Sequence, residues 1–400
     1  MGPSIMRWQV GGQASEIVIV GGGVMGSALA YWLTRLEPGL PVTVVERDPT
    51  YRAASSALSA ASIRQQYTTP VNIGISQWSV KFLRETAEHL AIDDDRPDVG
   101  LHEGGYLYLA GTSGAPVLAA AHAIQRAHGA DVALLCPAEL RERFPWLATD
   151  DLVSGSLGLS GEGWFDGYGL LTAFARKARS QGVRYLRAEV VGLERAGDRI
   201  GAVRLDDGSR LACGSVVNAA GPWARGVAAM AGIDLPVHAR RRTVFVIACR
   251  ERLERFPLLI DPTGFWIRPE GDRFIAGAVP HEDADDLPLE PDYAPFEAEL
   301  WPALAARIPA FEAARLERAW AGYYEMNTFD HNAIVGPHPS LANLYFVNGF
   351  SGHGLQQAPA VGLALAERIT TGRYATIDLA PLGFERILEG RPLLELNVIG

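Results

Sequence analysis

The sequence predicts a mixed α/β (α+β) fold with two domains, and three observations lead to this expectation. The chain has 400 residues, which is too long for one simple core. Near its start, a β-branched run ends in closely spaced glycines and leads into a helix of small residues, which is typical of a Rossmann-like unit. Further along, several short strand-like runs indicate a second sheet.

The first βαβ unit extends over residues 16–47. Its first strand, Ile17–Val20, is followed by Gly21, Gly23 and Gly26 in the spacing G-x-G-x-x-G. In this spacing the first glycine makes the turn, the second lets the backbone approach a pyrophosphate, and the third allows close packing of helix on strand. The start of the helix offers free N–H groups and a partial positive charge to phosphates.

The second strand of the unit, Val42–Glu46, ends in an acid. Glu46 lies twenty residues after Gly26, where a carboxylate can accept hydrogen bonds from ribose hydroxyls. Glycine-rich turns are common, so a plain strand–helix turn is the alternative interpretation. The complete order of strand, glycines, helix, strand and acid favours a dinucleotide-binding site.

Periodicity and turn residues predict the remaining elements. Helices are expected over residues 71–90, 115–128, 137–144, 170–181, 296–308 and 356–372. Strands are expected over 106–109, 183–194, 202–211, 215–221, 243–248, 264–268, 273–278 and 344–348. The strands 183–194 and 202–211 are expected to pair across a tight turn, and the glycine-rich segment 155–169 is expected to cross between domains.

Composition narrows the range of partners. The formal net charge of −10 argues against nucleic acid or an anionic membrane as the main partner. Three separate cysteines lack metal-ligand spacing, and we expect no metal site. The uncharged segment 17–33 is short and interrupted by four glycines, so no membrane span is expected. Residues 1–16 lack a basic leader, and we expect a cytoplasmic protein.

Three motifs together resemble a known superfamily. They are Gly21–Gly26 with Glu46 and Arg47, the run VNAAGPW at 217–223, and NGFSGHGLQQAPAVG at 348–362. In this order they resemble the FAD-dependent amino acid and amine oxidoreductases of the D-amino acid oxidase and sarcosine oxidase superfamily. The resemblance covers nearly the whole chain. The runs 62–67, 320–330 and 377–381 indicate one subgroup within it.

The resemblance implies a fold and a reaction. The FAD-binding Rossmann-like domain would consist of residues 14–92, 160–230 and 326–400, and the substrate-binding domain with its antiparallel sheet of residues 93–159 and 231–325. The implied reaction oxidises the C–N bond of a small amino acid or secondary amine, sarcosine-like or D-amino acid, by hydride transfer to flavin N5. The flavin supplies the difficult chemistry, so no acid–base dyad is required.

The resemblance also implies which residues bind FAD. Backbone N–H groups of Gly352–Gln356 would stabilise negative charge at the flavin pyrimidine edge. Relatives that attach FAD covalently use a cysteine where this chain has Gly322, or a histidine in the segment matching 51–67, which has none here. FAD is therefore expected to bind non-covalently. The implied FAD-binding residues are Gly21, Gly23, Val24, Met25, Gly26, Glu46, Arg47, Ser55, Ser56, Val190, Ala220, Gly221, Trp223, Gly352, His353, Gly354, Leu355 and Gln356.

Four residues are the candidates for catalysis and substrate binding. By resemblance, Arg64 binds the substrate carboxylate, for which a guanidinium is well suited, although a surface arginine is the alternative. Tyr324 is either a hydrogen-bond donor to that carboxylate or a core aromatic. Gln356 stands where sarcosine oxidases have a lysine, which leaves the substrate open. His353 is interpreted as a turn residue beside the flavin, with a catalytic base as the alternative.

Other residues are weaker candidates. Trp266 and Tyr323 are predicted to form cavity walls, and one residue of the cluster Arg240–Arg242 is expected to face flavin or substrate. The strand 273–277 lacks the lysine that activates oxygen in sarcosine oxidase, so a dehydrogenase is favoured over an oxidase. The electron acceptor would then be another molecule, including an acceptor protein or partner subunits.

Three other functions remain open at this stage. An NAD-dependent dehydrogenase would use the same glycines but gives the 352–356 turn no role. A low-turnover flavoprotein that acts as an assembly factor is the second. One subunit of a heteromeric amine dehydrogenase is the third. The sequence does not choose among sarcosine-like, D-amino acid, cyclic imino acid and opine-type substrates.

Overall fold

A six-stranded sheet forms the centre of one half of the molecule. The computed structural model describes residues 9–10, 13–14, 16–280 and 283–396. The β-branched, fully buried run of β3 pairs in parallel on both sides, as expected for a strand covered on both faces. The sheet order is β10 (Arg184–Arg187), β4 (Val42–Glu46), β3 (Ile17–Val20), β14 (Ser215–Asn218), β21 (Leu341–Asn348) and β20 (Ile334–His338). All neighbours are parallel except β20, which runs antiparallel to β21.

Helices cover one face of this sheet, and α8 (Ala224–Ala229) lies with a small sheet on the other. Within the helical layer α1 packs against α7 and α10, and α10 packs against α3. Gly362 brings α10 close to α1, because a Cβ there would lie 3.1 Å from the Ala28 backbone. The layer consists of α1 (Val24–Leu36), α3 (Pro70–Arg84), α7 (Gly167–Ser180) and α10 (Gly354–Thr371). The small antiparallel sheet consists of β11 (Val190–Ala196), β12 (Arg199–Leu205) and β13 (Arg210–Ala212).

An eight-stranded sheet forms the other half, and its pairs are antiparallel except for β16 with β6. Its order is β19 (Arg315–Asn327), β15 (Val237–Ala248), β18 (Arg273–Ala278), β17 (Phe265–Glu270), β16 (Leu258–Ile260), β6 (Tyr106–Ala110), β8 (Ser154–Gly158) and β7 (Val132–Leu135). The accompanying helices are α5 (Ala115–Ala127), α6 (Pro137–Arg143) and α9 (Trp301–Arg307). Shorter elements are β1 (Gln9–Val10), β2 (Gln13–Ala14), α2 (Ser55–Leu58), β5 (Ser62–Ile63), α4 (Thr86–His89), β9 (Gly163–Trp164), η1 (Gly221–Trp223), η2 (Phe296–Leu300), η3 (Pro309–Ala313), η4 (Ala380–Leu382) and α11 (Glu385–Leu388).

The structure corrects two predictions. The predicted strand 183–194 is two strands: β10 joins the parallel sheet, and β11 pairs with β12 in the small sheet. The change of sheet follows the end of β4, because Ala188 N still donates to Glu46 O and the chain then leaves that ladder. The segment 155–169 is not only a crossing, since β8 and β9 lie within it. A Cβ on Gly155 would come 3.0 Å from Leu140, so this glycine serves helix packing.

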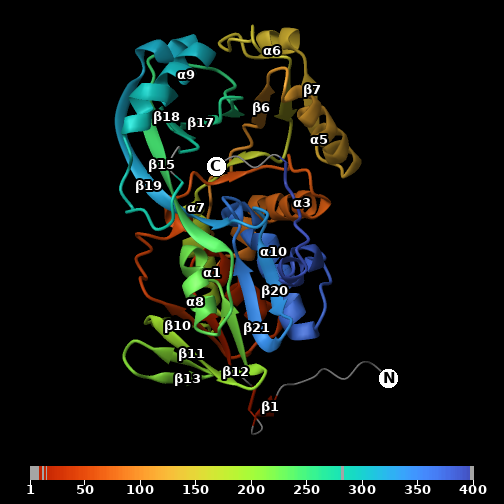
Figure 1. Ribbon diagram of the computed structural model, residues 1–400, viewed down its shortest axis with the longest axis vertical. Helices are drawn as coiled ribbons and strands as arrows, with labels where there is room; N and C mark the ends of the chain where they lie inside the picture. The colour runs from red at the N-terminus through yellow and green to blue at the C-terminus, as the bar shows by residue number, and fades with distance from the viewer. Residues whose placement is uncertain (1–8, 11–12, 15, 281–282, 397–400) are drawn as a thin grey trace.

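The predicted α/β class with a second, antiparallel sheet is confirmed. Figure 1 shows the parallel sheet with α1, α8 and α10 in the lower half of the view and β15, β17, β18 and β19 with α9 in the upper half. We propose to divide the chain at the boundaries expected from the sequence, of which residues 15, 281–282 and 397–400 lie outside the described residues. In the described part of the chain no helix is long and apolar enough to cross a membrane, and no cluster of metal-ligating residues occurs.

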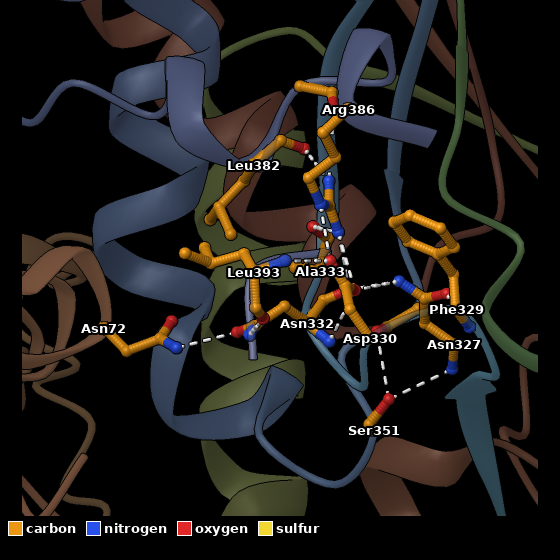
Figure 2. A network of polar contacts seen from close by, with 12 residues as sticks. Asn72, Asn327, Phe329, Asp330, Asn332, Ala333, Ser351, Leu382, Arg386 and Leu393 are labelled. Atoms are coloured by element: carbon orange, nitrogen blue, oxygen red, sulfur yellow. Dashed lines mark hydrogen bonds and ion pairs between the residues drawn. The ribbon is translucent and has the colours of Figure 1, made fainter. Parts of the chain in front are cut away.

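A buried ion pair fixes the C-terminal segment to the sheet. Arg386 of α11 donates to both carboxylate oxygens of Asp330, at 2.7 and 3.0 Å, and to the carbonyl of Ala333. The Asp330 carboxylate also accepts from Asn327 Nδ2 and from the backbone of Leu393, as Figure 2 shows. The side chains of Arg386 and Asp330 are 5% and 0% exposed. Removing one partner would leave the other charge buried without compensation.

We expect Arg386→Met to lower the free energy of unfolding by about 3–5 kcal/mol, because it leaves the buried Asp330 carboxylate without its ion-pair partner. Chemical denaturation of the purified protein measures this change. Arg391→Met is the matched control. Arg391 pairs with Glu389 at the surface, where an ion pair contributes about 0–1 kcal/mol. Equal effects of the two substitutions would contradict the role assigned to the buried pair.

Candidate functional site

One cavity of about 590 Å³ runs along the boundary between the two halves. Its size falls in the range of ligand-binding pockets. The parallel sheet contributes the ends of β3 and β4 and the start of α1, and the large sheet contributes β15, β17 and β19. Because the carboxyl ends of parallel strands share one edge, ligands of such sheets bind there. The cavity therefore lies where a doubly wound sheet places its ligand.

The glycine turn after β3 forms one wall of the cavity. Gly21 has φ +102°, and a Cβ there would come 2.4 Å from the Ala219 carbonyl oxygen. A Cβ on Gly26 would come 2.0 Å from the Gly21 carbonyl oxygen, so only glycine permits this packing of α1 on the strand. Gly23 is the N-cap of α1 and, with Gly21, Val24 and Met25, lines the cavity. Apart from the amide of Val24, which donates to Ser56 Oγ, the first amides of α1 are therefore available to an anionic ligand.

Glu46 lies at the end of β4 in the same cavity. One carboxylate oxygen accepts from Gly22 N and the other from Asp48 N, each at 2.8 Å. These backbone bonds fix the carboxylate in place while leaving lone pairs for a ligand hydroxyl. Arg47 beside it stacks on Trp223, with its guanidinium carbon 3.9 Å from the ring centroid. This end of the cavity is thus polar and has one aromatic face, formed by Glu46, Arg47 and Trp223.

Two serines of α2 connect the halves around the cavity. Ser56 Oγ accepts from the first amide of α1, Val24 N, at 3.2 Å. Ser55 Oγ donates to the Tyr323 carbonyl of β19 at 2.5 Å. Both serines line the cavity, as do Val190, Ala220 and Gly221 on the opposite side. α2 is only four residues long, and these contacts hold it between the two sheets.

A second helix begins at the other end of the cavity. Gly352 has φ +89°, and a Cβ there would lie 2.7 Å from the Tyr324 ring, so the turn needs glycine. His353 is the N-cap of α10, an 18-residue helix. Gly352, Gly354 and Leu355 line the cavity. The positive ends of α1 and α10 therefore both face one cavity.

Arg64 lies behind this turn. Its Nη2 is 2.9 Å from His353 Nε2, its Nη1 donates to the Gln66 carbonyl, and its guanidinium carbon is 3.9 Å from the Tyr67 ring centroid. Its backbone N–H donates to Gln356 Oε1 at 2.9 Å. Most of the predicted FAD-binding and catalytic residues line the cavity. The exceptions are Gly26, Arg64, His353 and Gln356, which are not among its lining residues. Arg64 therefore lies outside the lining of the cavity, and the carboxylate-binding role expected for it stays a prediction.

His353 is neutral in this environment. Burial, reinforced by the positive charge of Arg64, holds the pKa of its imidazole well below the ordinary value. Its Nε2 accepts from Arg64 Nη2, because a guanidinium can only donate, and the ring also forms a hydrogen bond with the backbone of Phe350. A neutral histidine held in this way is a poor proton carrier. The geometry favours the interpretation of His353 as a turn residue.

Aromatic side chains close the cavity at the end near α10. Tyr324, Tyr323 and Trp266 all line it, as predicted for the two wall residues. Trp266 lies over Gly277, where a Cβ would come 2.8 Å from the indole nitrogen. Tyr323 Oη donates to the Leu287 carbonyl at 2.7 Å. The part of the cavity that these three aromatic side chains line is called the slot, and Tyr324 places it beside the Gly352 turn that leads into α10.

Glu325 is a cavity residue that sequence reasoning missed. Its carboxyl accepts from the backbone N–H of Gly349 at 3.2 Å and from that of Phe350, and it lines the cavity near Gly221 and Gly354. Removal from bulk water raises its pKa to about 8, despite those two hydrogen bonds. The signal available in the sequence was its place directly after Tyr324 in the 320–330 run.

The residues present fit FAD. Two helix N-termini suit an anionic ligand, a fixed carboxylate at the Glu46 end suits a ribose, and a glycine turn without Cβ atoms lets a flat ring system approach α10. The cavity joins these features in one continuous space. FAD would therefore lie with its nucleotide part toward Glu46 and its flavin toward Tyr324.

The family model for "FAD dependent oxidoreductase" matches residues 16–368. The chain belongs to this family. Its cofactor is FAD, and the superfamily and subgroup predicted from the motifs are confirmed. The chain is similar to "FAD-dependent oxidoreductase domain-containing protein 1" of Xenopus laevis, with 43% identity over 426 residues that cover 97% of this chain and 85% of the relative. It is 28% identical to mitochondrial dimethylglycine dehydrogenase of Rattus norvegicus, over 95% of this chain and 45% of that protein.

Solved structures of FAD family members show the same fold. L-proline dehydrogenase from P. horikoshii aligns with a TM-score of 0.84 and 29% identity, covering 94% of this chain and 99% of that one. Glycine oxidase from Geobacillus kaustophilus aligns with a TM-score of 0.78 and 25% identity, covering 92% and 98%. This FAD-dependent oxidoreductase is thus matched along nearly its whole length.

The raised pKa of Glu325 predicts a pH-dependent stability. The native state keeps a proton that the unfolded chain releases above pH 4.5, so stability falls as pH rises from about 4.5 to about 8. Glu325→Gln should remove this loss and stabilise the protein at pH 8 by an amount on the order of 1–3 kcal/mol relative to pH 5. Thermal unfolding across this pH range, with FAD in constant excess, measures it. Glu142→Gln at the surface should keep the wild-type profile, and an unchanged profile in Glu325→Gln would contradict the assignment.

Proposed function

We propose that the protein oxidises the C–N bond of a small amino acid or secondary amine. The observation that carries this proposal is the aromatic slot lined by Tyr323, Tyr324 and Trp266, which is part of the same cavity that fits FAD. A small substrate would lie there against the flavin. The names of two relatives, L-proline dehydrogenase and glycine oxidase, describe amino acids as substrates, which supports the same class for this chain.

The chain contributes positioning to this reaction. FAD, when bound, accepts the hydride from the substrate carbon. The amides at the starts of α1 and α10 favour negative charge at the two ends of the cofactor. The aromatic slot would exclude water and orient the substrate, and the Tyr324 hydroxyl would donate a hydrogen bond to it. The neutral His353 is not needed as a base when the amine binds deprotonated.

Arg64 lies on the far side of the α10 turn from the cavity and contacts residues of that turn. Through its side chain it contacts His353, and through its backbone it contacts Gln356, so it joins the segment after β5 to the first turn of α10. Its charge also acts on the buried hydroxyl of Tyr324. We propose that Arg64 fixes the α10 turn. The carboxylate-binding role implied by the family resemblance is a separate hypothesis, which the binding of benzoate by Arg64→Gln tests.

We further propose that the enzyme is a dehydrogenase. Electron transfer to oxygen forms an anion beside an anionic reduced flavin, so a fixed cation nearby lowers the barrier. β18 presents Ile275 and Ala276 at the position where sarcosine oxidase has lysine, and His353 is neutral. Arg242 shares its charge with Asp283. The electron acceptor would be a partner protein or another small molecule.

Anaerobic mixing of the FAD-loaded protein with a panel of amino acids and secondary amines tests the function. We expect at least one member, among sarcosine-like compounds, D-amino acids, cyclic imino acids and opines, to bleach the flavin absorbance. The reduced enzyme is then mixed with air-saturated buffer or with an artificial acceptor, and we expect the acceptor to reoxidise it faster. Equal rates would show an oxidase. A flavin that no member of the panel bleaches would favour a flavoprotein with a binding or assembly role.

FAD should be held without a covalent bond. A Cβ on Gly322, which stands at the cysteine position, would come 3.0 Å from Leu58, and no histidine occurs in 51–67. Acid precipitation should therefore release all flavin absorbance into the supernatant. Flavin retained in the washed pellet would contradict this expectation.

A further inference from the structure

Arg242 is an arginine in the wall of the substrate slot. It lies on β15 opposite Gly322 of β19, and the register places Tyr324 diagonally across on the same face. Gly322 carries no side chain, and Leu58 of α2 packs over it, since a Cβ there would lie 3.0 Å from Leu58 Cβ. Its guanidinium carbon is 5.1 Å from the centroid of the Tyr324 ring. Arg242 and Tyr324 both line the cavity.

The guanidinium of Arg242 is held by hydrogen bonds from one of its nitrogens, and its other donors have no hydrogen-bond partner among the described residues. Its hydrogen bonds to described residues come from Nη1, which donates to Asp283 Oδ1 at 2.6 Å and to the Arg241 carbonyl at 3.0 Å. Nε is buried and has no hydrogen-bond partner among the described residues. The side chain is 8% exposed, whereas that of Asp283 is 39% exposed. Nη2 is not among the buried atoms and makes no hydrogen bond to a described residue, so it is the donor that a bound acceptor can reach.

The other arginines that line the cavity lie away from Tyr324. Arg47 stacks on Trp223 at the Glu46 end. Arg225 lies near Asp234 and His238, and its side chain is 50% exposed. Of the described arginines that line the cavity, Arg242 is therefore the one at the Tyr324 end. Arg64, although near Tyr324, contacts His353 and Tyr67 behind the turn.

We propose that Arg242 binds the anionic group of the substrate and so selects carboxylate-bearing amines over neutral ones. This inference rests on the proposed function, because it concerns the same slot. The Arg242 guanidinium and the Tyr324 hydroxyl would share the substrate carboxylate. Asp283 keeps the guanidinium in place through Nη1 and leaves Nη2 for the ligand. The amine would then point toward the start of α10, where the flavin ring would lie.

The geometry explains why an arginine serves here better than a lysine. The side chain has to reach the slot, lie near the Tyr324 ring and hold Asp283 at the same time. A planar fork with five donors can do all three, whereas an ammonium group is a single point charge. The ion pair with Asp283 and the contact with Tyr324 are thus parts of one arrangement.

A pair of matched probes separates charge from shape. Benzoate and benzamide are both flat and fit an aromatic slot, but only benzoate carries a negative charge. Titration of each into the FAD-loaded protein, followed by the flavin absorbance, gives the two dissociation constants without turnover. We expect Arg242→Gln to weaken benzoate binding by about tenfold or more and to leave benzamide binding within about twofold. Arg242→Lys should weaken benzoate less than Arg242→Gln does, because the charge remains.

Arg241→Gln is the matched control. Arg241 is the next residue on the same strand, on the opposite face, and it too pairs with the loop, through Asp292. We expect this variant to bind both probes as the wild type does. Arg64→Gln is included as the competing assignment. A selective loss of benzoate affinity in Arg64→Gln, with none in Arg242→Gln, would overturn the inference. It would assign the binding of the substrate carboxylate to Arg64.

Two further outcomes decide the matter. Equal weakening of benzoate and benzamide in Arg242→Gln would overturn the inference, since it would indicate a distorted slot. If that variant fails to retain FAD, Arg242→Lys decides: selective weakening of benzoate supports the inference, and unchanged binding overturns it. Failure of the proposed function is recognised separately, because the wild-type flavin would then resist reduction by every amine while the selective loss of benzoate in Arg242→Gln persists.

Discussion

The close approach of α1 to the turn after β3 is the constraint on which the rest of the site depends. A Cβ at Gly26 would come 2.0 Å from the Gly21 carbonyl, so the helix can begin directly at the carboxyl edge of the sheet only because both positions are glycine. The same edge carries the end of β21, which leads into α10. Parallel pairing through β14 therefore brings two helix N-termini to one cavity. An anionic dinucleotide has favourable partners at both ends of that cavity.

The wall opposite this edge comes from the large sheet. β15 and β19 place Arg242 and Tyr324 on the same face, and β17 adds Trp266. Neither half alone would enclose a substrate, because the cofactor lies on the parallel sheet and the selective side chains come from the antiparallel one. The site therefore requires both halves to keep a fixed relation. Ser55 and Ser56 of α2, each bonded to a different half, contribute to it.

Buried polar groups extend this connection behind the site. Glu162 accepts from the side chain of Gln66 at 2.8 Å, and burial raises the pKa of its carboxyl to about 7. Gln66 also donates to the Tyr106 carbonyl of β6. Near the C-terminus, Glu395 accepts from Thr69 at the start of α3, and Asn332 joins that region to Asn72. Such networks favour one arrangement of the elements, because a partly satisfied set of buried polar groups is costly.

The sequence by itself determined the first βαβ unit, the glycine turns and the acid at the end of the second strand. These features depend on neighbours within a few residues, since a turn without Cβ atoms and a β-branched strand are local requirements. It also predicted the α/β class, most helices and the cavity walls at Tyr323 and Trp266. The motifs carried the family and its cofactor.

Only the tertiary structure decided which side chains reach the cavity. The division of residues 183–194 between two sheets, the pairing of β15 with β19 and the placement of Arg64 behind the α10 turn all depend on contacts between residues far apart in the chain. A strand pattern states that alternate residues share a face, but not which strand lies opposite. The register selected Arg242 from the predicted cluster Arg240–Arg242, and Glu325 became visible as a site residue only beside the glycine turn, because exposure to a cavity is a property of the packed halves together.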